Sequence, residues 1–335
     1  MIIQENISLL NFNTFHIDAT ARYFAEYYSI DELNNILSSS WRKDLPLLCI
    51  GGGSNLLFTK DYEGVVLHSG MKNILVSGED KSHIYLYADS GVIWDDFVAY
   101  CVDHNLYGAE NLSLIPGEVG ASAIQNIGAY GVEAKDIISK VHTIEINTGK
   151  IRTFDVIECA YGYRQSIFKK DLKDQYIITG VTFRLSKEPC FMLSYGNLNS
   201  MINDNEITLS NVRNTIIDIR RSKLPDPAVT GNAGSFFMNP FVSKEKYESL
   251  LKTYPDMPHY LVDEFNVKVP AGWLIERCGW KGKSLGQAAV HDKQALVLIN
   301  KGAATAQEII SLAKQVCQDV HTKFGIEIHP EVIYI

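Results

Sequence analysis

Two glycine-rich stretches are the parts of this sequence whose residue types best suit an anion. The first is residues 51–55, Gly-Gly-Gly-Ser-Asn, after the apolar run 47–50, and the second covers residues 115–131. Glycines let the backbone turn tightly and direct several N–H groups at one ligand, which suits a diphosphate. The first stretch does not match the G-x-G-x-x-G or P-loop pattern, so by itself it favours an ordinary turn over a phosphate-binding loop. Together, with the amides of Gln125 and Asn126, they provide what a dinucleotide requires.

Basic side chains in two other segments could bind anionic groups. Arg164 stands among tyrosines in residues 161–166. A guanidinium there could stack on a flat ring or hold a carboxylate through two hydrogen bonds. Residues 220–223, Arg-Arg-Ser-Lys, form a local basic cluster that suits a diphosphate. In both segments the alternative is a solvent-exposed charge without a ligand.

A serine in an apolar setting is a candidate proton donor. Ser235 lies between Gly234 and the pair Phe236 and Phe237. Its hydroxyl could be presented in a water-poor pocket, where it could donate a proton to substrate. The alternative is a serine that caps a turn.

Two further patterns resemble catalytic motifs but lack their context. Residues 282–286 match G-x-S-x-G, yet that motif needs a buried strand before it and a helix after it. The preceding residues, 277–283, are polar and interrupted by glycine. His291 and His329 have no partner at helical spacing, so we expect structural or surface histidines and no metal site.

The hydrophobic pattern predicts the elements that position these segments. Apolar, β-branched runs predict strands at residues 47–50, 64–67, 84–88, 141–146, 151–154 and 176–185. Helical spacing predicts helices at about residues 93–104 and 211–222, and a long one ending at Phe324. Thr305 and Glu308 form a capping box before that last helix, and a strand-like tail follows it. Because strands and helices do not alternate strictly, we expect an α+β fold.

Composition limits the class of protein. The chain has 335 residues, 46% of them hydrophobic, and a formal net charge of −8. The length predicts two domains with their own cores, and the acidic total argues against a nucleic-acid binder. No apolar run is long enough to span a membrane, and the six scattered cysteines are typical of reduced thiols. We therefore expect a cytoplasmic protein with no nucleic-acid or membrane partner.

Taken together, the segments resemble the UDP-N-acetylenolpyruvoylglucosamine reductase family, flavoenzymes of bacterial cell-wall synthesis. The resemblance extends along the whole chain and depends on the order of residues 13–15, 51–57, 115–131, 161–169, 223–227, 231–240, 271–276, 294–300 and 330–332. It implies a two-lobed FAD-binding fold like that of para-cresol methylhydroxylase and vanillyl-alcohol oxidase, plus a smaller α+β substrate-binding domain. The implied ranges are 1–65 with the tail 325–335 for the first lobe, 66–219 for the second, and 220–324 for the substrate domain.

The resemblance also implies roles for individual residues. Three would be catalytic: Arg164 on the substrate carboxylate, Ser235 as proton donor, and Glu331 beside the same carboxylate. Non-covalent FAD would be held by Gly51, Gly52, Gly53, Ser54, Asn55, Gly117, Gly120, Ser122, Gln125, Asn126, Gly128, Tyr130, Tyr163 and Ile178. The substrate would be held by Tyr195, Lys223, Asn239, Tyr260 and Gln294. Tyr195 matches a loop tyrosine that closes over substrate in one subgroup of the family.

The implied reaction is reduction of UDP-N-acetylglucosamine enolpyruvate to UDP-N-acetylmuramate, with NADPH as hydride donor. Hydride addition to the terminal alkene carbon develops an enolate, which a fixed cation must stabilise and an acid must protonate. We expect a monomer. One alternative is a flavin oxidase of the same fold, against which the Ser235 loop and the Lys223 region argue. Another is a non-catalytic flavin or sugar-nucleotide binder, which the intact Arg164, Ser235 and Glu331 disfavour.

Overall fold

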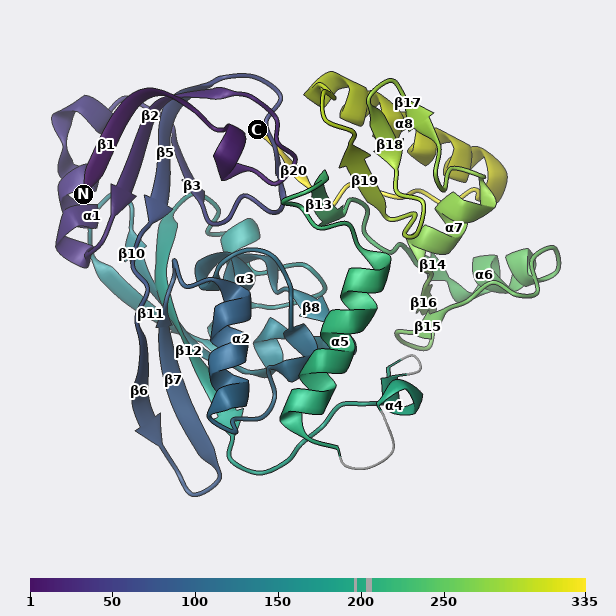
Figure 1. Cartoon of the computed structure of the whole chain (residues 1–335), viewed down its shortest axis with the longest axis horizontal. Helices are drawn as coiled ribbons and strands as arrows, with labels where there is room; N and C mark the ends of the chain where they lie inside the picture. Colours follow the sequence, from purple (N-terminus) through teal and green to yellow (C-terminus); the bar gives the residue numbers. More distant parts are fainter. Residues whose placement is uncertain (196–197, 203–206) are drawn as a thin grey trace. The chain divides into compact units, whose positions relative to one another are not determined.

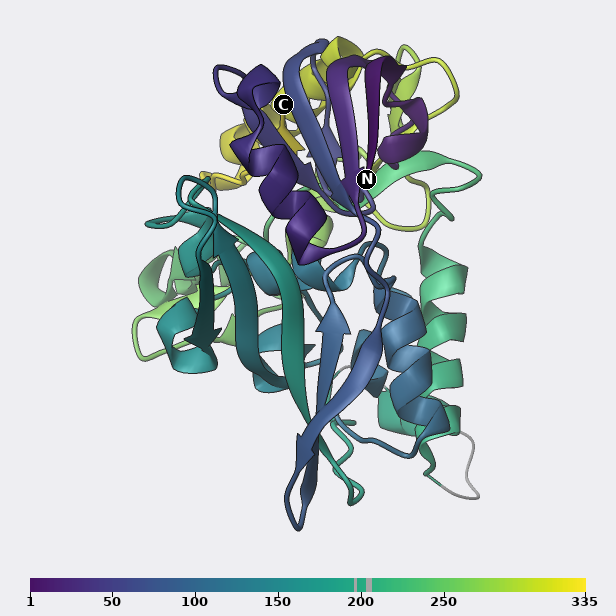
Figure 2. The same cartoon turned by 90° about the vertical axis from the view of Figure 1, so that its left-hand side faces the viewer.

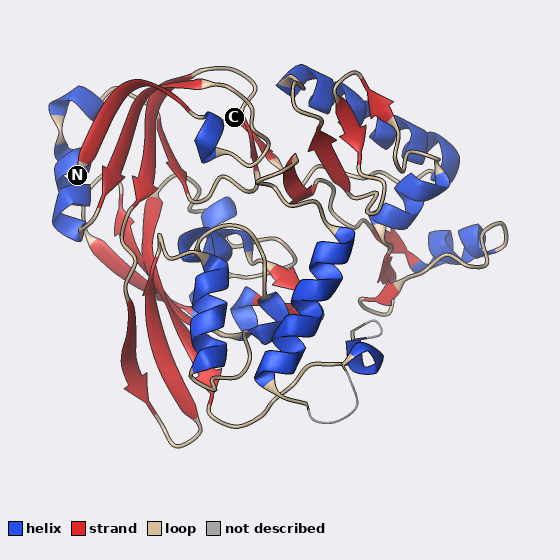
Figure 3. Ribbon diagram, viewed as in Figure 1, coloured by secondary structure: helices blue, strands red, loops and turns tan. Residues whose placement is uncertain are grey.

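The computed structural model describes residues 1–195, 198–202 and 207–335. Helices and strands are mixed along the chain, which confirms the expected α+β class (Figure 3). The chain falls into two compact units: unit 1 is Met1–Ile7, Thr20–Gly52 and Tyr62–Ser222, and unit 2 is Ser8–Ala19, Gly53–Asp61 and Lys223–Ile335. The three domain ranges expected from the resemblance stay a prediction.

A four-stranded sheet in unit 1 carries the first glycine stretch. Its order is β1 (Ile2–Ser8), β2 (Thr20–Tyr27), β5 (Tyr62–Ser69) and β3 (Leu47–Ile50), as Figure 1 shows. Both β2 and β3 run parallel to β5. The helix α1 (Ile30–Ser38) buries Leu33, Ile36 and Leu37 in one core with Val65 and Leu67 of β5. Residue 51 therefore starts a loop at the carboxyl end of a parallel strand.

A five-stranded antiparallel sheet in unit 1 supports the second glycine stretch. Its order is β11 (Ile151–Asp155), β10 (Ile138–Glu145), β12 (Tyr176–Ser186), β7 (His83–Asp89) and β6 (Ile74–Glu79). The helices α2 (Trp94–Asp103) and α3 (Val119–Gln125) share its core, where the ring centroids of Phe97 and Phe183 lie 4.3 Å apart. Unit 1 also contains the short strands β8 (Gly128–Ala129) and β9 (Val132–Glu133) and the helix α4 (Leu198–Met201).

The helix α5 (Leu209–Lys223) lies beside α2 in both views (Figures 1 and 2). The guanidinium of Arg213 donates to the two carboxylate oxygens of Asp95 at 2.7 and 3.0 Å. This bidentate pair is partly buried, a geometry that fixes direction as well as distance. Arg213 therefore aligns α5 against α2, and this alignment positions the basic residues 220–223 at the end of α5.

Unit 2 contains small sheets and three helices. One sheet has the order β13 (Gly231–Ser235), β19 (Val297–Asn300), β18 (Ala288–Val290) and β17 (Ser284–Leu285). Another has the order β14 (Phe241–Ser243), β16 (Asn266–Lys268) and β15 (Tyr260–Leu261). The tail strand β20 (Ile333–Tyr334) pairs in parallel with β4 (Leu56–Leu57). The helices are α6 (Lys244–Leu251), α7 (Ala271–Arg277) and α8 (Ala306–Phe324).

Most elements predicted from the hydrophobic pattern are present, with shifts of a few residues at their ends. The hairpin β10–β11 and the strands β3, β5, β7 and β12 lie where the apolar runs predicted them. The capping box at α8 is confirmed, since the Thr305 hydroxyl accepts from the Glu308 N–H at 3.2 Å and the Glu308 carboxylate accepts from the Thr305 N–H at 2.8 Å. Among the described residues, none of the helices combines the length and apolarity needed to cross a bilayer.

Thr305→Ala should destabilise unit 2 by about 1 kcal/mol, because it removes the hydroxyl that accepts from the first turn of α8. Thr305→Ser keeps that acceptor and serves as the control. Urea unfolding followed by far-ultraviolet circular dichroism measures the difference. An unchanged unfolding midpoint for Thr305→Ala would show that the capping box does not stabilise the helix.

Candidate functional site

The first glycine stretch is built so that side chains are excluded from it. A Cβ atom on Gly52 would lie 3.3 Å from the Cα of Gly117, so the two glycine stretches approach each other closely in unit 1. Gly53, in unit 2, has φ +62°, and a Cβ there would lie 2.1 Å from the carbonyl oxygen of Phe12. The contact and the positive φ at Gly53 require glycine, and the contact at Gly52 is tight enough to disfavour a larger side chain. Ser54 and Asn55 follow in unit 2, where the Asn55 amide donates to the carbonyl of Glu331 at 3.3 Å.

The second stretch is anchored on α3. A Cβ on Gly120 would lie 2.8 Å from the Cβ of Ser90, so the helix can approach Ser90 only with glycine at this position. The hydroxyl of Ser122 is buried and donates to the carbonyl of Val119 at 2.7 Å. The structure thus brings Gly52, Gly117 and Gly120 together and turns Ser122 inward.

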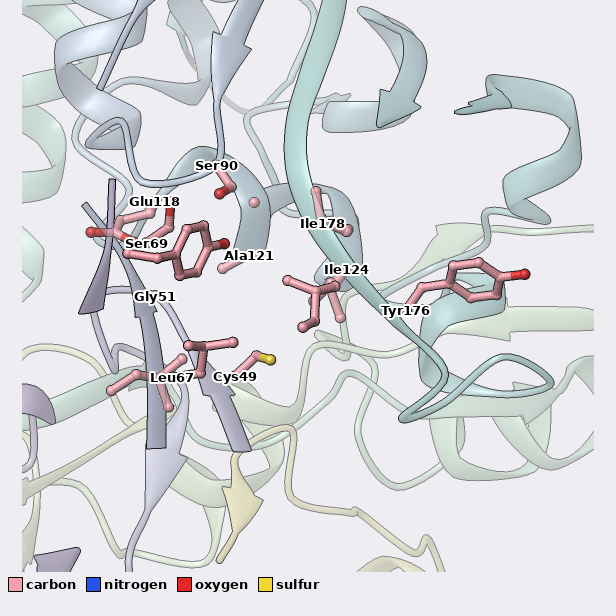
Figure 4. A pocket seen from close by; sticks show the side chains of 14 residues that line it. Cys49, Gly51, Leu67, Ser69, Ser90, Glu118, Ala121, Ile124, Tyr176 and Ile178 are labelled. Atoms are coloured by element: carbon pink, nitrogen blue, oxygen red, sulfur yellow. The ribbon is translucent and has the colours of Figure 1, made fainter. Parts of the chain in front are cut away.

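A cavity of about 90 Å³ opens in unit 1 beside both stretches (Figure 4). Its lining comes from β2, β3, β5, β12 and α3 and comprises Tyr27, Cys49, Ile50, Gly51, Leu67, Ser69, Ser90, Glu118, Gly120, Ala121, Ile124, Tyr176, Ile177 and Ile178. Three residues expected to bind cofactor, Gly51, Gly120 and Ile178, are among them. Burial raises the pKa of Tyr27 to about 12, so its hydroxyl stays uncharged, and Glu118 is the acidic side chain of the lining. Glycine edges for phosphate and apolar walls for a ring are what a flavin nucleotide requires, so the residues present fit FAD.

Asn126, Gln125 and Gly128 connect the second stretch to Arg164. Asn126 is fully buried, and its amide nitrogen donates to the carbonyl of Gly162 at 2.9 Å. Its side-chain oxygen accepts from the Lys135 N–H at 3.0 Å. The Gln125 side-chain oxygen accepts from the Lys169 ammonium at 2.7 Å. These amides therefore stabilise the loop from inside unit 1.

Arg164 is held by backbone carbonyls of the same loop. Its guanidinium donates to the carbonyl of Gly128 at 2.9 Å and to that of Asn126 at 3.3 Å, and it lies 5.3 Å from the ring centre of Tyr163. Lys169 donates to the carbonyl of Arg164 at 3.0 Å. Arg164 itself has φ +55°, a left-handed conformation that is costly for a residue with a Cβ. Such strain is typical of functional positions.

Tyr130 and Tyr195 lie near each other in unit 1. Their ring centroids are 6.3 Å apart in an edge-to-face arrangement. Burial raises the pKa of Tyr130, although the neighbouring Arg220 guanidinium opposes the shift. The Nε of Arg220 donates to the carbonyl of Leu114 at 3.2 Å, so α5 also contacts the residue just before the second glycine stretch. Lys223, the last residue of α5, is exposed.

In unit 2 the structure places Glu331 beside the strand of Ser235. Ser235 pairs with Val297 of β19 and is exposed, whereas Phe236 and Phe237 are buried. The Glu331 N–H donates to the carbonyl of Phe236 at 2.7 Å. The tail thus runs along the residues that follow Ser235, and the serine and the carboxylate come from adjacent backbone positions.

The start of α7 lies between two residues expected to bind substrate. The side-chain oxygen of Asn239 accepts from the Ala271 N–H at 2.9 Å. A Cβ on Gly272 would lie 3.3 Å from the side-chain oxygen of Gln294. Tyr260, on β15, is 40% exposed, and the Lys268 ammonium lies 5.6 Å from its ring centre. Asn239 and Gln294 therefore both lie at the start of α7, and the side chain of Tyr260 is partly accessible to solvent.

Residues 282–286 and the two histidines, His291 and His329, have the following surroundings in unit 2. Residues 284–285 of the G-x-S-x-G pattern form the strand β17, with no helix directly after it. Burial lowers the pKa of His291, and the side chain of His329 is 67% exposed. Across the described ranges, no three His, Cys, Asp or Glu side chains are arranged to hold a metal ion.

Comparison with known proteins agrees with this geometry. The family model of an FAD binding domain matches residues 21–155, and that of the UDP-N-acetylenolpyruvoylglucosamine reductase C-terminal domain matches residues 226–335. The UDP-N-acetylenolpyruvoylglucosamine reductase of Bacteroides fragilis strain YCH46 is 54% identical over 334 residues, covering 99% of this chain and 100% of the relative. That of Porphyromonas gingivalis strain W83 is 47% identical and covers 100% of both chains. The crystal structure of the reductase from Thermus caldophilus superposes with a TM-score of 0.71 at 19% identity, covering 99% of each chain.

The chain is therefore an FAD-binding oxidoreductase with a separate C-terminal domain. It belongs to the UDP-N-acetylenolpyruvoylglucosamine reductase family. The family, fold class, reductase activity and FAD cofactor expected from the sequence are confirmed. Sequence reasoning did not identify His68 or Lys72 as neighbours of the site, because no local pattern connects them to the glycine stretches. Glu118 and Lys169 lie within segments that the sequence singled out, but their ion pair and hydrogen bonds were not predicted.

Gly52→Val should prevent FAD binding, because the side chain would occupy the space now taken by Gly117. Gly78→Val is the control, since a Cβ on Gly78 meets nothing within 4 Å. Flavin released from each purified protein on denaturation is the measurement. A Gly52→Val protein with full flavin content would show that the contact between the two stretches is not needed for FAD.

Proposed function

We propose that this enzyme reduces the enolpyruvyl ether of UDP-N-acetylglucosamine enolpyruvate to UDP-N-acetylmuramate, using NADPH, and so contributes to peptidoglycan synthesis, cell shape and division. The observation that carries the proposal is the hydrogen bond from the Glu331 N–H to the carbonyl of Phe236 at 2.7 Å. It sets the backbone of Glu331 beside the residue that follows Ser235, which supports the assignment of both side chains to one site. Protonation of an enolate needs such a pairing of a donor with a charged neighbour.

Ser235 is assigned as the proton donor. Its backbone is fixed by pairing with Val297, and the positive φ of Gly234, +65°, turns the chain just before it. The buried rings of Phe236 and Phe237 give the next residues an apolar floor. A hydroxyl on this rigid strand end can be aimed at one carbon atom of the substrate, which is what stereospecific protonation requires.

Arg164 is assigned to the substrate carboxylate. Its guanidinium is permanently charged and is oriented by the carbonyls of Gly128 and Asn126. Charge that develops as enolate can delocalise into a carboxylate held this way, so the same contact stabilises the transition state more than the ground state. Glu331 is assigned to the same end of the substrate.

The remaining assignments concern binding. FAD, when bound, supplies hydride transfer from NADPH to the substrate, and residues 51–55 and 117–130 with Tyr163 and Ile178 would hold it. The close approach of Gly52 to Gly117 supports this assignment. Asn239, Gln294, Lys223, Tyr260 and Tyr195 would hold the nucleotide-sugar. The place of Asn239 and Gln294 on either side of the start of α7 supports a shared ligand.

The setting of the reaction is also proposed. NADPH and nucleotide-sugars are supplied in the cytoplasm, so we place the enzyme there, acting as a monomer. Sedimentation of the flavin-loaded protein would check the monomer.

The visible spectrum of the purified protein tests the reaction. Flavin absorbance should be present, should fall on addition of NADPH, and should return on addition of the enolpyruvyl nucleotide-sugar. Production of hydrogen peroxide in step with NADPH oxidation would instead indicate a flavin oxidase. A colourless protein with no flavin after denaturation would contradict the proposal.

Ser235→Ala should lower turnover by about 10³-fold while NADPH still bleaches the flavin at the normal rate, because only the proton donor is lost. Ser284→Ala, an exposed serine on another strand of the same sheet, is the matched control and should leave turnover unchanged. Stopped-flow absorbance separates the two half-reactions. Normal turnover by Ser235→Ala would exclude this serine as the donor.

Glu331→Gln should lower turnover by about 10²-fold without altering the fold, because its backbone N–H still donates to Phe236. Glu327→Gln is the control from the same tail, where the Glu327 side chain is 71% exposed. Steady-state kinetics at saturating substrate give the comparison. Equal losses in both variants would point to a general effect of the tail's charge instead of a role for Glu331.

A further inference from the structure

Four charged side chains in unit 1 form a cluster at the edge of the cavity. The Glu118 carboxylate oxygen Oε1 lies 3.1 Å from Nε2 of His68 and 3.2 Å from the ammonium of Lys72. The other ring nitrogen of His68, Nδ1, lies 2.8 Å from a carboxylate oxygen of Glu26. Lys72 also donates to the carbonyl of Gly91. The imidazole therefore lies between two carboxylates, and one of these is shared with a lysine.

Glu118 connects this cluster to both glycine stretches. It follows Gly117 in the chain, lines the cavity and is only 7% exposed. Its second carboxylate oxygen, Oε2, lies 3.2 Å from the position that a Cβ on Gly51 would take. The carboxylate thus packs directly against the first stretch, and Figure 4 shows Glu118 and Gly51 on the same side of the cavity.

A buried carboxylate at this position conflicts with an anionic ligand unless it is neutralised. Two negative charges in a partly desolvated space repel each other strongly, and a lone buried carboxylate is itself costly. With His68 protonated, the two carboxylates are balanced by Lys72 and His68, so the cluster is neutral. With His68 neutral, the cluster carries one net negative charge beside the glycine stretches.

We propose that His68 and Lys72 neutralise Glu118 so that the cavity can accept the diphosphate of FAD, and that FAD affinity therefore follows the protonation of His68. The proposal rests on the proposed placement of FAD at the two glycine stretches. Glu118 acts here as a positioning residue, because its carboxylate packs against Gly51 and so keeps the first glycine stretch beside the second. The protonation state of His68 sets the net charge of the cluster when FAD binds.

The titration of His68 has a definite direction. Burial lowers the pKa of the imidazole, but the hydrogen bonds and charges of Glu118 and Glu26 raise it by more, so the pKa lies above its ordinary value. The other titratable groups near the cluster are Lys72 on the loop after β5, Tyr27 and Tyr28 at the end of β2, and Cys49 on β3. Bound diphosphate would raise the pKa of His68 further. FAD should therefore bind most tightly below this pKa and more weakly as the pH rises through it.

The test is a fluorescence titration of the flavin-free, full-length protein with FAD at pH 6 and pH 8.5. The Kd of the wild-type protein should increase about tenfold between the two, the effect of a shift of about one pKa unit on binding. His68→Asn should bind FAD at pH 6 as weakly as the wild-type protein does at pH 8.5 and should show no pH dependence. His142→Asn is the control, because His142 is another partly buried imidazole of unit 1, hydrogen-bonded to the Thr182 hydroxyl instead of a carboxylate.

Glu118→Gln gives a result that damage to the fold cannot imitate. It removes the negative charge and keeps the shape, so at pH 8.5 it should bind FAD about tenfold more tightly than the wild-type protein. Weaker binding by Glu118→Gln at that pH, a pH-independent Kd in the wild-type protein, or normal pH dependence in His68→Asn would each overturn this inference alone. Failure to bind FAD at any pH would overturn the proposed function as well.

Discussion

The position of Glu331 depends on the pairing of the chain's tail with earlier segments of unit 2. The Glu331 N–H donates to Phe236, and two residues later β20 pairs in parallel with β4. The carbonyl of Ile335 accepts from the Thr59 N–H at 2.8 Å. These bonds use only backbone atoms, and they fix the backbone position of Glu331 within unit 2. A backbone held in this way gives the side chain of Glu331 a fixed starting point, which is what the role proposed for it requires.

The local part of this architecture was predictable from the sequence. The capping box and apolar stripe of α8 are contained within twenty consecutive residues, and strands such as β12 are marked by uninterrupted β-branched runs. Short elements such as β8, β9 and β15 lack any such signal. Each has only two residues, so its pairing is decided by neighbours distant in sequence and not by propensity.

The candidate site also has one part that was predictable from the sequence and one part that was not. Glycine composition predicted two loops that could act together, and the approach of Gly52 to Gly117 agrees with that expectation. Composition did not predict that the side-chain amide of Asn126 would form its hydrogen bonds to other residues of unit 1. It also did not predict that Glu118 would pair with His68 on β5 and with Lys72 after that strand. Those contacts join residues separated by long stretches of chain, and charge complementarity at a distance leaves no periodic pattern. The roles proposed for the individual residues follow from the resemblance.

The left-handed backbone at Arg164 sets the stability of the fold against the role proposed for its guanidinium. An L-residue with a side chain costs roughly 1–2 kcal/mol in this conformation, whereas glycine adopts it freely. A library selected for resistance to heat or proteolysis would therefore be expected to enrich glycine at this position and lose the guanidinium assigned to the carboxylate. Engineering this scaffold for robustness should keep residue 164 fixed and look for gains elsewhere.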